Sequence, residues 1–319
     1  MERSSSENQR TESAAPAVSA RDVSLSFGKV KAVDGVSMEV RKGETFGIIG
    51  PDGAGKTTLF RLLTSLAVPE RGKMEVCGHD TVSEYAAIRR KIGYMPGKFS
   101  LYQDLTVEEN LNFFAGLYGT TVEENYHLIK DIYCRLEPFR KRRAGKLSGG
   151  MKQKLALSCA LIHKPQVLFL DEPTTGVDPV SRKEFWDMLA RLKSEGITII
   201  VSTPYMDEAA RCDRMAMMLG GKFLATDTPD GFRRSYASDL FGVRASDMRS
   251  LLQDVRGWSG TKSAFSFGDC VHLSSAEDAD IGSLRRHLEN AGHREVEINR
   301  IEPSVEDCFM AVCAEQALR

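Results

Sequence analysis

Residues 45–63 read TFGIIGPDGAGKTTLFRLL, and this stretch decides the fold. A short apolar strand, Thr45–Ile49, leads into a glycine-rich loop, and leucines at helical spacing follow the loop. Residues 50–57 match the pattern G-x-x-x-x-G-K-[ST], in which backbone N–H groups and the start of the next helix attract phosphate oxygens. We expect Lys56 to reach the β- and γ-phosphates of a nucleotide and the Thr57 hydroxyl to bind Mg²⁺. A chance match at a glycine-rich turn is the alternative, and the strand before the loop and the helix after it argue against that alternative.

A second motif, Val167–Glu172, is an apolar strand that ends in two adjacent carboxylates. Asp171 can hold Mg²⁺, often through water, and Glu172 can polarise the water that attacks a γ-phosphate. Solvated acids at a strand end are common, so this motif carries weight only beside the first.

The third motif is LSGGMKQK, residues 147–154, in which Ser148, Gly149 and Gly150 precede a helical pattern. A hydroxyl and free backbone N–H groups at a helix start form another anion site, and a flexible turn is the alternative. One chain cannot easily bring two such sites to one phosphate within its own sheet. A second copy of the chain or a partner is therefore implied.

Buried apolar strands alternate with helices before residue 230, which predicts an α/β fold with a mostly parallel sheet. Near residue 230 the composition changes, and two strand-helix-strand units follow in the order of a ferredoxin-like fold. We therefore predict a disordered tail over residues 1–17, a nucleotide-binding domain over 18–234 and a small α+β accessory domain over 235–319. Besides Thr45–Ile49, the predicted strands of the larger domain are Ala20–Phe27, Gly35–Val40, Ile92–Met95, Val167–Leu170, Ile197–Ser202 and Arg214–Leu219.

The overall composition limits the partners and the cellular compartment that we expect for this protein. The net charge of the 319-residue chain is −1, which gives no electrostatic reason to expect nucleic acid as a partner. The seven cysteines are scattered without CxxC spacing, as in a protein with reduced thiols. No apolar run is long enough to cross a bilayer, and the first residues do not resemble a secretory signal. We expect a cytoplasmic protein whose contact with a membrane goes through a partner.

The segments GPDGAGKTT, LSGGMKQK and LFLDEPTTGVDP, in this order and spacing, resemble the nucleotide-binding domains of ABC transporters over about residues 20–230. The resemblance implies a P-loop fold of the ABC type and a head-to-tail dimer that holds two ATP molecules with Mg²⁺ between its chains. It assigns Glu172 as the catalytic carboxylate, Thr57 and Asp171 to Mg²⁺, and Asp178 to the dimer interface. The nucleotide contacts that it implies are Phe27, Gly50, Pro51, Asp52, Gly53, Ala54, Gly55, Lys56, Thr57 and Thr58 on one chain, with Ser148, Gly149 and Gly150 reaching the opposite ATP.

Three further segments relate to this resemblance. Phe27 stands where the family has an aromatic residue that stacks on adenine, and a plain core residue is the alternative. Glu302–Phe309, EPSVEDCF, resembles the ending of drug-exporter-type ATPases, which work with separate integral membrane permease subunits. Lys98–Leu111 falls where the family docks a cytosolic helix of its channel, and an amphipathic surface segment is the alternative.

Two positions depart from the family pattern. Gly97 stands where a glutamine contacts Mg²⁺ and the attacking water, and Pro204 stands where a histidine contacts the γ-phosphate. Asp52 in place of the usual asparagine is a milder change. The two losses suggest a degenerate, slow ATP site, and they favour a heterodimer with a second, different nucleotide-binding chain over a homodimer.

The leading hypothesis is therefore the ATP-hydrolysing subunit of a multidrug or other efflux exporter. A regulatory or structural ABC subunit with little hydrolysis is the main alternative because Gly97 and Pro204 lack side-chain donors. An ABC protein acting on ribosomes or DNA is disfavoured by the single set of motifs and the near-zero charge. The transported substrate is not encoded in this sequence.

Overall fold

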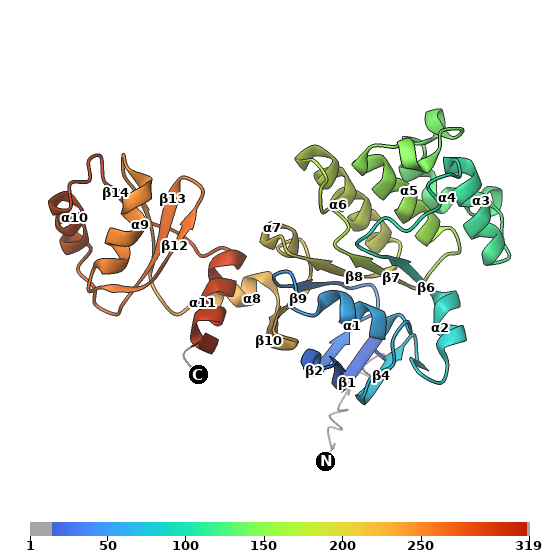
Figure 1. Ribbon diagram of the computed structural model, residues 1–319, viewed down its shortest axis with the longest axis horizontal. Helices are drawn as coiled ribbons and strands as arrows, with labels where there is room; N and C mark the ends of the chain where they lie inside the picture. Colours follow the sequence, from blue (N-terminus) through green and yellow to red (C-terminus); the bar gives the residue numbers. More distant parts are fainter. Residues whose placement is uncertain (1–14, 318–319) are drawn as a thin grey trace, which may run out of the picture.

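The computed structural model describes residues 15–317, with side chains to residue 314. The tail predicted over residues 1–17 thus lies mostly outside the described residues. Its last residue, Ala17, is buried, and its backbone pairs with Val40 and Cys77 at 2.8 Å. Figure 1 shows a large lobe and a small lobe joined by α8 and α11. Among the described residues, no helix combines the length and apolar character that crossing a bilayer requires.

A six-stranded sheet in the order β10-β9-β3-β8-β7-β6 forms the centre of the large lobe. All neighbouring strands in it run parallel except the edge pair β9 and β10. The prediction of a mostly parallel sheet is therefore confirmed. Its strands are β3 (Thr45–Ile49), β6 (Ile92–Met95), β7 (Val167–Asp171), β8 (Thr198–Thr203), β9 (Arg214–Leu219) and β10 (Lys222–Asp227).

A second, antiparallel sheet has the order β2-β1-β4-β5. Helix α1 (Lys56–Leu63) lies between the two sheets, and Phe60 packs edge-on against Phe169 of β7 with ring centroids 5.9 Å apart. The glycine-rich loop therefore lies between two buried elements, β3 before it and α1 after it. The strands are β1 (Val18–Phe27), β2 (Val30–Val40), β4 (Arg71–Val76) and β5 (His79–Asp80), and α2 (Tyr85–Lys91) follows them.

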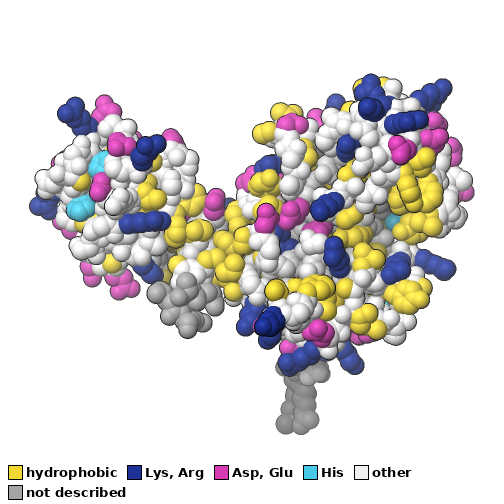
Figure 2. Space-filling view, viewed as in Figure 1, with side chains coloured by type: hydrophobic (Ala, Val, Ile, Leu, Met, Phe, Trp, Pro, Cys, Tyr) yellow, Lys and Arg dark blue, Asp and Glu magenta, His cyan; other side chains and the backbone are white. Residues whose placement is uncertain are grey.

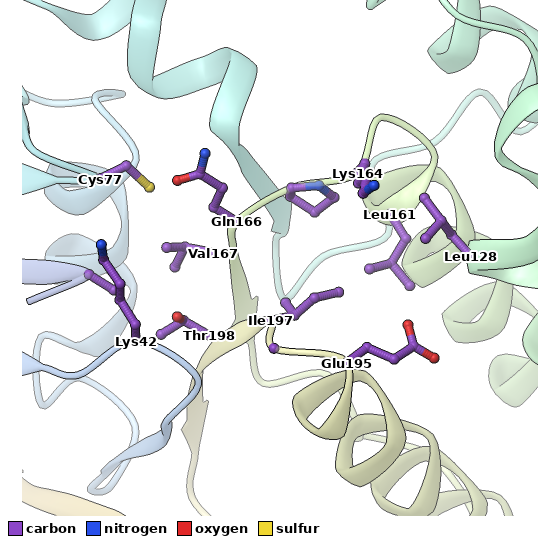
Figure 3. A pocket seen from close by; sticks show the side chains of 13 residues that line it. Lys42, Cys77, Leu128, Leu161, Lys164, Gln166, Val167, Glu195, Ile197 and Thr198 are labelled. Atoms are coloured by element: carbon purple, nitrogen blue, oxygen red, sulfur yellow. The ribbon is translucent and has the colours of Figure 1, made fainter.

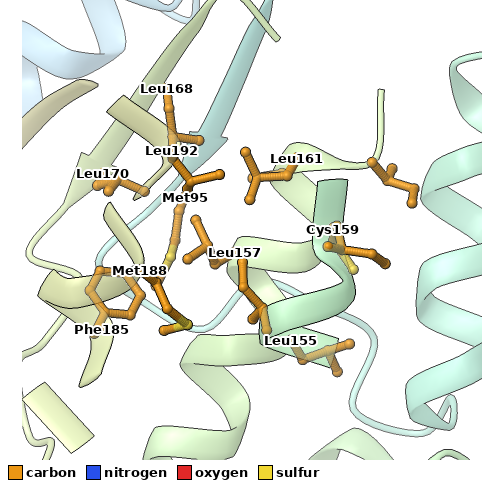
Figure 4. Close-up of a cluster of buried hydrophobic side chains, with 14 of the residues drawn as sticks. Met95, Leu155, Leu157, Cys159, Leu161, Leu168, Leu170, Phe185, Met188 and Leu192 are labelled. Atoms are coloured by element: carbon orange, nitrogen blue, oxygen red, sulfur yellow. The ribbon is translucent and has the colours of Figure 1, made fainter. Parts of the chain in front are cut away.

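Helices cover the other face of the central sheet, and Figure 4 shows side chains of β7, α5 and α6 meeting in this layer. Thr106 and Thr121 each begin a helix with a capping box, in which the threonine and a glutamate three residues later satisfy each other's backbone N–H groups. The helices are α3 (Val107–Leu117), α4 (Val122–Tyr133), α5 (Gly149–Leu161) and α6 (Pro179–Ser194), with short 3₁₀ turns at Glu137–Phe139 and Ala144–Lys146.

The small lobe has the strand order β12-β13-β11-β14, antiparallel throughout, with α9 and α10 packed on one face. This is the ferredoxin-like order that the sequence predicts. Its elements are β11 (Leu240–Arg244), α9 (Met248–Gly257), β12 (Thr261–Phe267), β13 (Cys270–Ser275), α10 (Ile281–Asn290) and β14 (Glu297–Arg300).

After the small lobe the chain returns to the large one through α11 (Val305–Ala317), which contacts α7 (Met206–Ala209) and α8 (Pro229–Arg234). Phe309 of α11 is buried in one cluster with Ile49, the last residue of β3. Asp307, also buried, accepts a hydrogen bond from Nδ1 of His272 in β13 at 2.8 Å. The proposed division at 234/235 therefore places in the accessory domain a helix whose apolar side chains complete the core of the large lobe.

Candidate nucleotide site

The glycine-rich loop joins β3 to α1 where the backbone passes close to other segments. A Cβ at Gly50 would lie 2.2 Å from the carbonyl oxygen of Met218. At Gly55, where φ is +107°, it would lie 2.1 Å from the carbonyl oxygen of Ala32. Only glycine fits at these two positions, so the loop keeps the tight curve that turns its N–H groups inward.

Lys56 opens α1, and its side chain is 3% exposed. Its Nζ donates to the carbonyl oxygens of Gly50 at 2.9 Å and Pro51 at 3.0 Å. It also lies 3.1 Å from Oε1 of Glu172, which follows β7. The two motifs, far apart in the sequence, thus meet because parallel strands end at the same edge of the sheet.

Ser202 of β8 contacts both carboxylate residues of the second motif. Its hydroxyl donates to Oδ1 of Asp171 at 2.5 Å, and Asp171 is 2% exposed. The N–H of Glu172 donates to the hydroxyl oxygen and to the carbonyl oxygen of Ser202, each at 3.0 Å. Glu172 has φ of +49°, a left-handed conformation that is uncommon outside glycine. The neighbouring strand therefore fixes both residues.

A cavity of about 390 Å³ lies over the loop, and the sequence-predicted residues Asp52, Gly53, Gly55, Lys56, Thr57, Thr58 and Glu172 line it. Its described lining does not include Gly50, Pro51 or Ala54, which form the underlying turn. Sequence reasoning missed the remaining lining residues, which come from β2 and the β9–β10 turn: Val30, Lys31, Ala32 and Gly220. No motif marks these positions, since only the folded chain brings them to the loop.

Phe27 ends β1 and is 57% exposed, so the alternative of a core residue is wrong. It pairs across the β1–β2 turn with Val30, which lines the cavity. The Phe27 ring is therefore free to stack on a flat ligand at the rim.

The donor set at this edge suits Mg²⁺. Thr57 lines the cavity, and Ser202 bonds only one carboxylate oxygen of Asp171, at the end of β7 directly before the lining residue Glu172. Mg²⁺ prefers such hard oxygen ligands and takes few from protein, completing its shell with waters and phosphate oxygens. The residues present therefore fit the ion.

The third motif faces elsewhere. Ser148 is exposed and caps α5, accepting from the N–H of Met151 at 3.4 Å. Gly150 lies against Ser181 of α6, where a Cβ would be 3.0 Å from the hydroxyl oxygen. The described residues lining the cavity over the loop do not include Ser148, Gly149 or Gly150. The glycine-rich loop and the third motif of one chain thus do not line the same cavity.

Asp178 is exposed at the start of α6, beside the third motif. Its carboxylate accepts from the N–H of Ser181 at 3.0 Å, and this hydrogen bond holds the pKa of Asp178 below its ordinary value. Asp178 therefore stays ionised on the surface that carries Ser148 and Gly149.

The two departures lie at the same edge of the sheet. A Cβ at Gly97 would be 3.1 Å from the carbonyl oxygen of Asp171 and 3.8 Å from Cβ of Glu172. Pro204 directly follows Thr203, whose hydroxyl donates to the buried carboxylate of Glu208 at 2.7 Å. Gly97 therefore borders the carboxylate pair, Pro204 follows the end of β8, and neither residue offers a side-chain donor.

A larger cavity, of about 480 Å³, lies at the opposite end of the central strands (Figure 3). Lys42 and Cys77 lie on one side of it and Leu128 on the other. It contains none of the predicted site residues among its described lining, so size alone does not locate the phosphate site.

Comparison with known proteins agrees with this geometry. The family model described as ABC transporter matches residues 33–175. The probable multidrug ABC transporter ATP-binding protein YbhF of Escherichia coli (strain K12) is 41% identical over 283 residues, covering 88% of this chain and 48% of that protein. The chain thus spans about half the length of that relative. The Nod factor export ATP-binding protein I of Rhizobium sp. (strain N33) is 38% identical over 244 residues, covering 74% of this chain and 80% of that protein.

Solved structures give the same result. An ATP-binding subunit of an ABC transporter superposes with a TM-score of 0.64 at 30% identity, covering 69% of this chain and 93% of that one. The dimeric post-hydrolysis state of the ATP-binding cassette MJ0796, bound to ADP and Pi, has a TM-score of 0.60 at 25% identity, covering 66% and 98%. Together with the phosphate loop and the paired carboxylates, these matches show that the chain belongs to the ATP-binding subunits of the ABC transporter family.

Proposed function

We propose that this chain binds ATP with Mg²⁺ and hydrolyses it slowly to drive export through separate integral membrane subunits. One observation carries the proposal: Lys56 and Thr57 of the phosphate loop and Glu172, which follows β7, line a single cavity, with Lys56 Nζ 3.1 Å from the Glu172 carboxylate. Phosphoryl transfer needs mainly positioning and charge stabilisation, and this edge offers both.

Each residue has one task in this proposal. Lys56 leaves the loop carbonyls and Glu172 to contact the β- and γ-phosphates, which frees the Glu172 carboxylate. Thr57 and Asp171 hold Mg²⁺, which neutralises charge on the phosphate oxygens when bound. Glu172 then orients the attacking water and accepts its proton. Phe27, exposed at the rim, stacks on the adenine.

The exposed third motif serves a second chain. Ser148 and Gly149 are exposed and lie outside the cavity, so they are available to the ATP held by another nucleotide-binding chain. Asp178 borders the same interface. One solved relative, the ATP-binding cassette MJ0796, is dimeric, which supports a pair of nucleotide-binding chains. Because this chain's own edge carries Gly97 and Pro204, a heterodimer is the assembly that we favour.

The membrane partner docks beside α3. Figure 2 shows apolar side chains gathered on the side of the large lobe where α2 and α3 lie. Tyr102 and Phe113 are 51% and 43% exposed and stack edge-on with centroids 4.9 Å apart. Asn110 fixes the backbone of Tyr102 through two hydrogen bonds, of 3.1 and 3.0 Å, so the ring is held ready for a partner.

A groove of about 290 Å³ is lined by Met95, Pro96, Leu101 and Tyr118 among others, and also by Phe114, whose ring contacts that of Phe113. A permease helix seated there would touch the strand end that borders the carboxylates. The chain would then work at the cytoplasmic face of the membrane. Relatives named for multidrug transport, Nod factor export and doxorubicin resistance support the export direction, as does the Glu302–Phe309 ending.

A regulatory subunit with little hydrolysis is the second candidate, favoured by the missing donors at Gly97 and Pro204. Replacing Glu172 with Gln distinguishes the two in the purified chain. We expect E172Q to retain ATP binding and to lose about 10²–10³ in turnover. Equal turnover in E172Q and the wild type would contradict the proposed role of Glu172.

The permease proposal has its own test. We expect the chain to sediment with membranes only when its cognate permease is co-expressed, and Tyr102→Ala to weaken that association. Sedimentation that does not depend on an integral membrane partner would exclude it.

A further inference from the structure

Ser202 is a fully buried serine at the end of β8, with 0% of its surface exposed. Its hydroxyl both accepts and donates a hydrogen bond, and the chemical nature of each partner fixes which role it plays. The N–H of Glu172 can only donate, so it is the donor to Oγ at 3.0 Å. The Asp171 carboxylate accepts, so Ser202 donates to its Oδ1 at 2.5 Å. One hydroxyl therefore contacts both residues of the carboxylate pair.

The two contacts do different things. The bond to Oδ1 of Asp171 fixes the rotation of that carboxylate and leaves its other oxygen for a ligand. The bond from Glu172 N–H, shared with the Ser202 carbonyl at 3.0 Å, holds Glu172 in its left-handed conformation with φ of +49°. A non-glycine residue keeps such a conformation only where its surroundings enforce it.

We propose that Ser202 is the positioning residue for both carboxylates: it aims Asp171 at Mg²⁺ and holds Glu172 toward the γ-phosphate. This inference rests on the proposed function, and it concerns a residue outside the recognised motifs. Its importance in this chain follows from Gly97 and Pro204, which border the same edge and provide no side-chain donor. Ser202 therefore provides the side-chain hydrogen bonds that hold the carboxylate pair in place at this edge.

Magnesium dependence of nucleotide binding tests the proposal in the full-length chain. The probe is an ATP analogue carrying an N-methylanthraniloyl fluorophore, titrated first in EDTA and then with increasing free Mg²⁺. We expect Ser202→Ala to bind the analogue in EDTA as the wild type does. We expect it to need about 10-fold or more free Mg²⁺ for the same gain in affinity, the usual cost of losing a partner of a metal ligand.

Ser158→Ala is the matched control. Ser158 is also 0% exposed, and its hydroxyl donates to the carbonyl oxygen of Lys154 at 2.9 Å within α5, away from the carboxylates. Ser158→Ala also removes one buried hydroxyl, and it should leave the Mg²⁺ requirement unchanged.

The outcomes separate this inference from the function on which it rests. If Ser202→Ala needs no more Mg²⁺ than the wild type, or loses affinity in EDTA to the same extent as with Mg²⁺, the positioning role is wrong while ATP binding stands. If the wild type itself does not bind the analogue, the proposed function fails and this inference fails with it.

Discussion

Replacing Pro204 with His should speed ATP hydrolysis. Pro204 lies two residues after Ser202, which bonds both carboxylate residues, and directly after Thr203, whose hydroxyl is committed to Glu208. Proline has neither a side-chain donor nor a backbone N–H. In the proposed mode of ATP binding, a histidine at this strand end adds a ring donor beside the γ-phosphate.

The size of the gain follows from the chemistry of the site. One preorganised donor to developing charge is worth roughly 10²–10³ in rate, or about 2.7–4 kcal/mol. Gly97→Gln should gain less, because its Cβ would lie 3.1 Å from the carbonyl oxygen of Asp171, tighter than ordinary contact. The segment would have to shift by a few tenths of an ångström, which displaces the strand end that carries Asp171. We expect less than about 10-fold from Gly97→Gln on the scale of one such donor.

Steady-state phosphate release by the purified full-length chain measures both variants, with single-turnover experiments to separate chemistry from product release. The wild type should be slower than the ordinary ~1–10 per second. Wild-type turnover within that range, with no increase in Pro204→His, would refute the slow site and remove the main argument for a heterodimer.

Four further predictions concern ATP binding, the pH dependence of stability, the packing of α11 and the division into domains. Lys56→Ala should weaken ATP binding by about 1.5–3 kcal/mol, the worth of a charge-assisted contact, and unchanged affinity in a titration would rule out the assignment. Burial lowers the pKa of His163 below its ordinary value of 6.5, so its contribution to folding stability is fully present above pH 6.5 and is lost as the pH falls below that value. His163→Gln should therefore reduce the fall in Tm on acidification. An unchanged dependence of Tm on pH would contradict the prediction. Phe309→Ala should cost about 3–5 kcal/mol in denaturant unfolding, against about 0.5 kcal/mol for the exposed Phe113→Ala. Truncation after residue 235 removes the same contacts and should lower Tm further while ATP binding survives, and a folded fragment that fails to bind ATP would refute the domain division.

The central strands could be predicted because they are buried on both faces. Thr45–Ile49, Ile92–Met95 and Arg214–Leu219 coincide with β3, β6 and β9, since almost every residue in them reads as apolar. The β2 strand begins at Val30 rather than at the predicted Gly35, because Lys31 and Asp34 interrupt the apolar pattern of its first half. The pairing of β1 and β2 with β4 into a separate sheet was not predicted, since it depends on contacts between distant segments.

Helices α3 and α4 were missed although Thr106 and Thr121 carry the capping signal T-V-E-E. The site residues likewise fall into those that the sequence could predict and one that it could not. Lys56 and Glu172 stand in motifs, and the common edge of a parallel sheet brings motifs together. Ser202 stands in none, and a serine at a strand end has no pattern that distinguishes it before the neighbouring strand is placed.

The return of α11 makes the small lobe an insertion rather than an appendage. The Sγ of Cys308 in α11 lies 3.4 Å from the carbonyl oxygen of Phe232 in α8, so the points where the chain leaves and re-enters the large lobe lie side by side. Domains inserted between neighbouring points can be exchanged with little cost to their host. The small lobe should therefore be replaceable by a short linker, or by the equivalent lobe of another ABC protein, while α11 continues to cover the apolar end of β3.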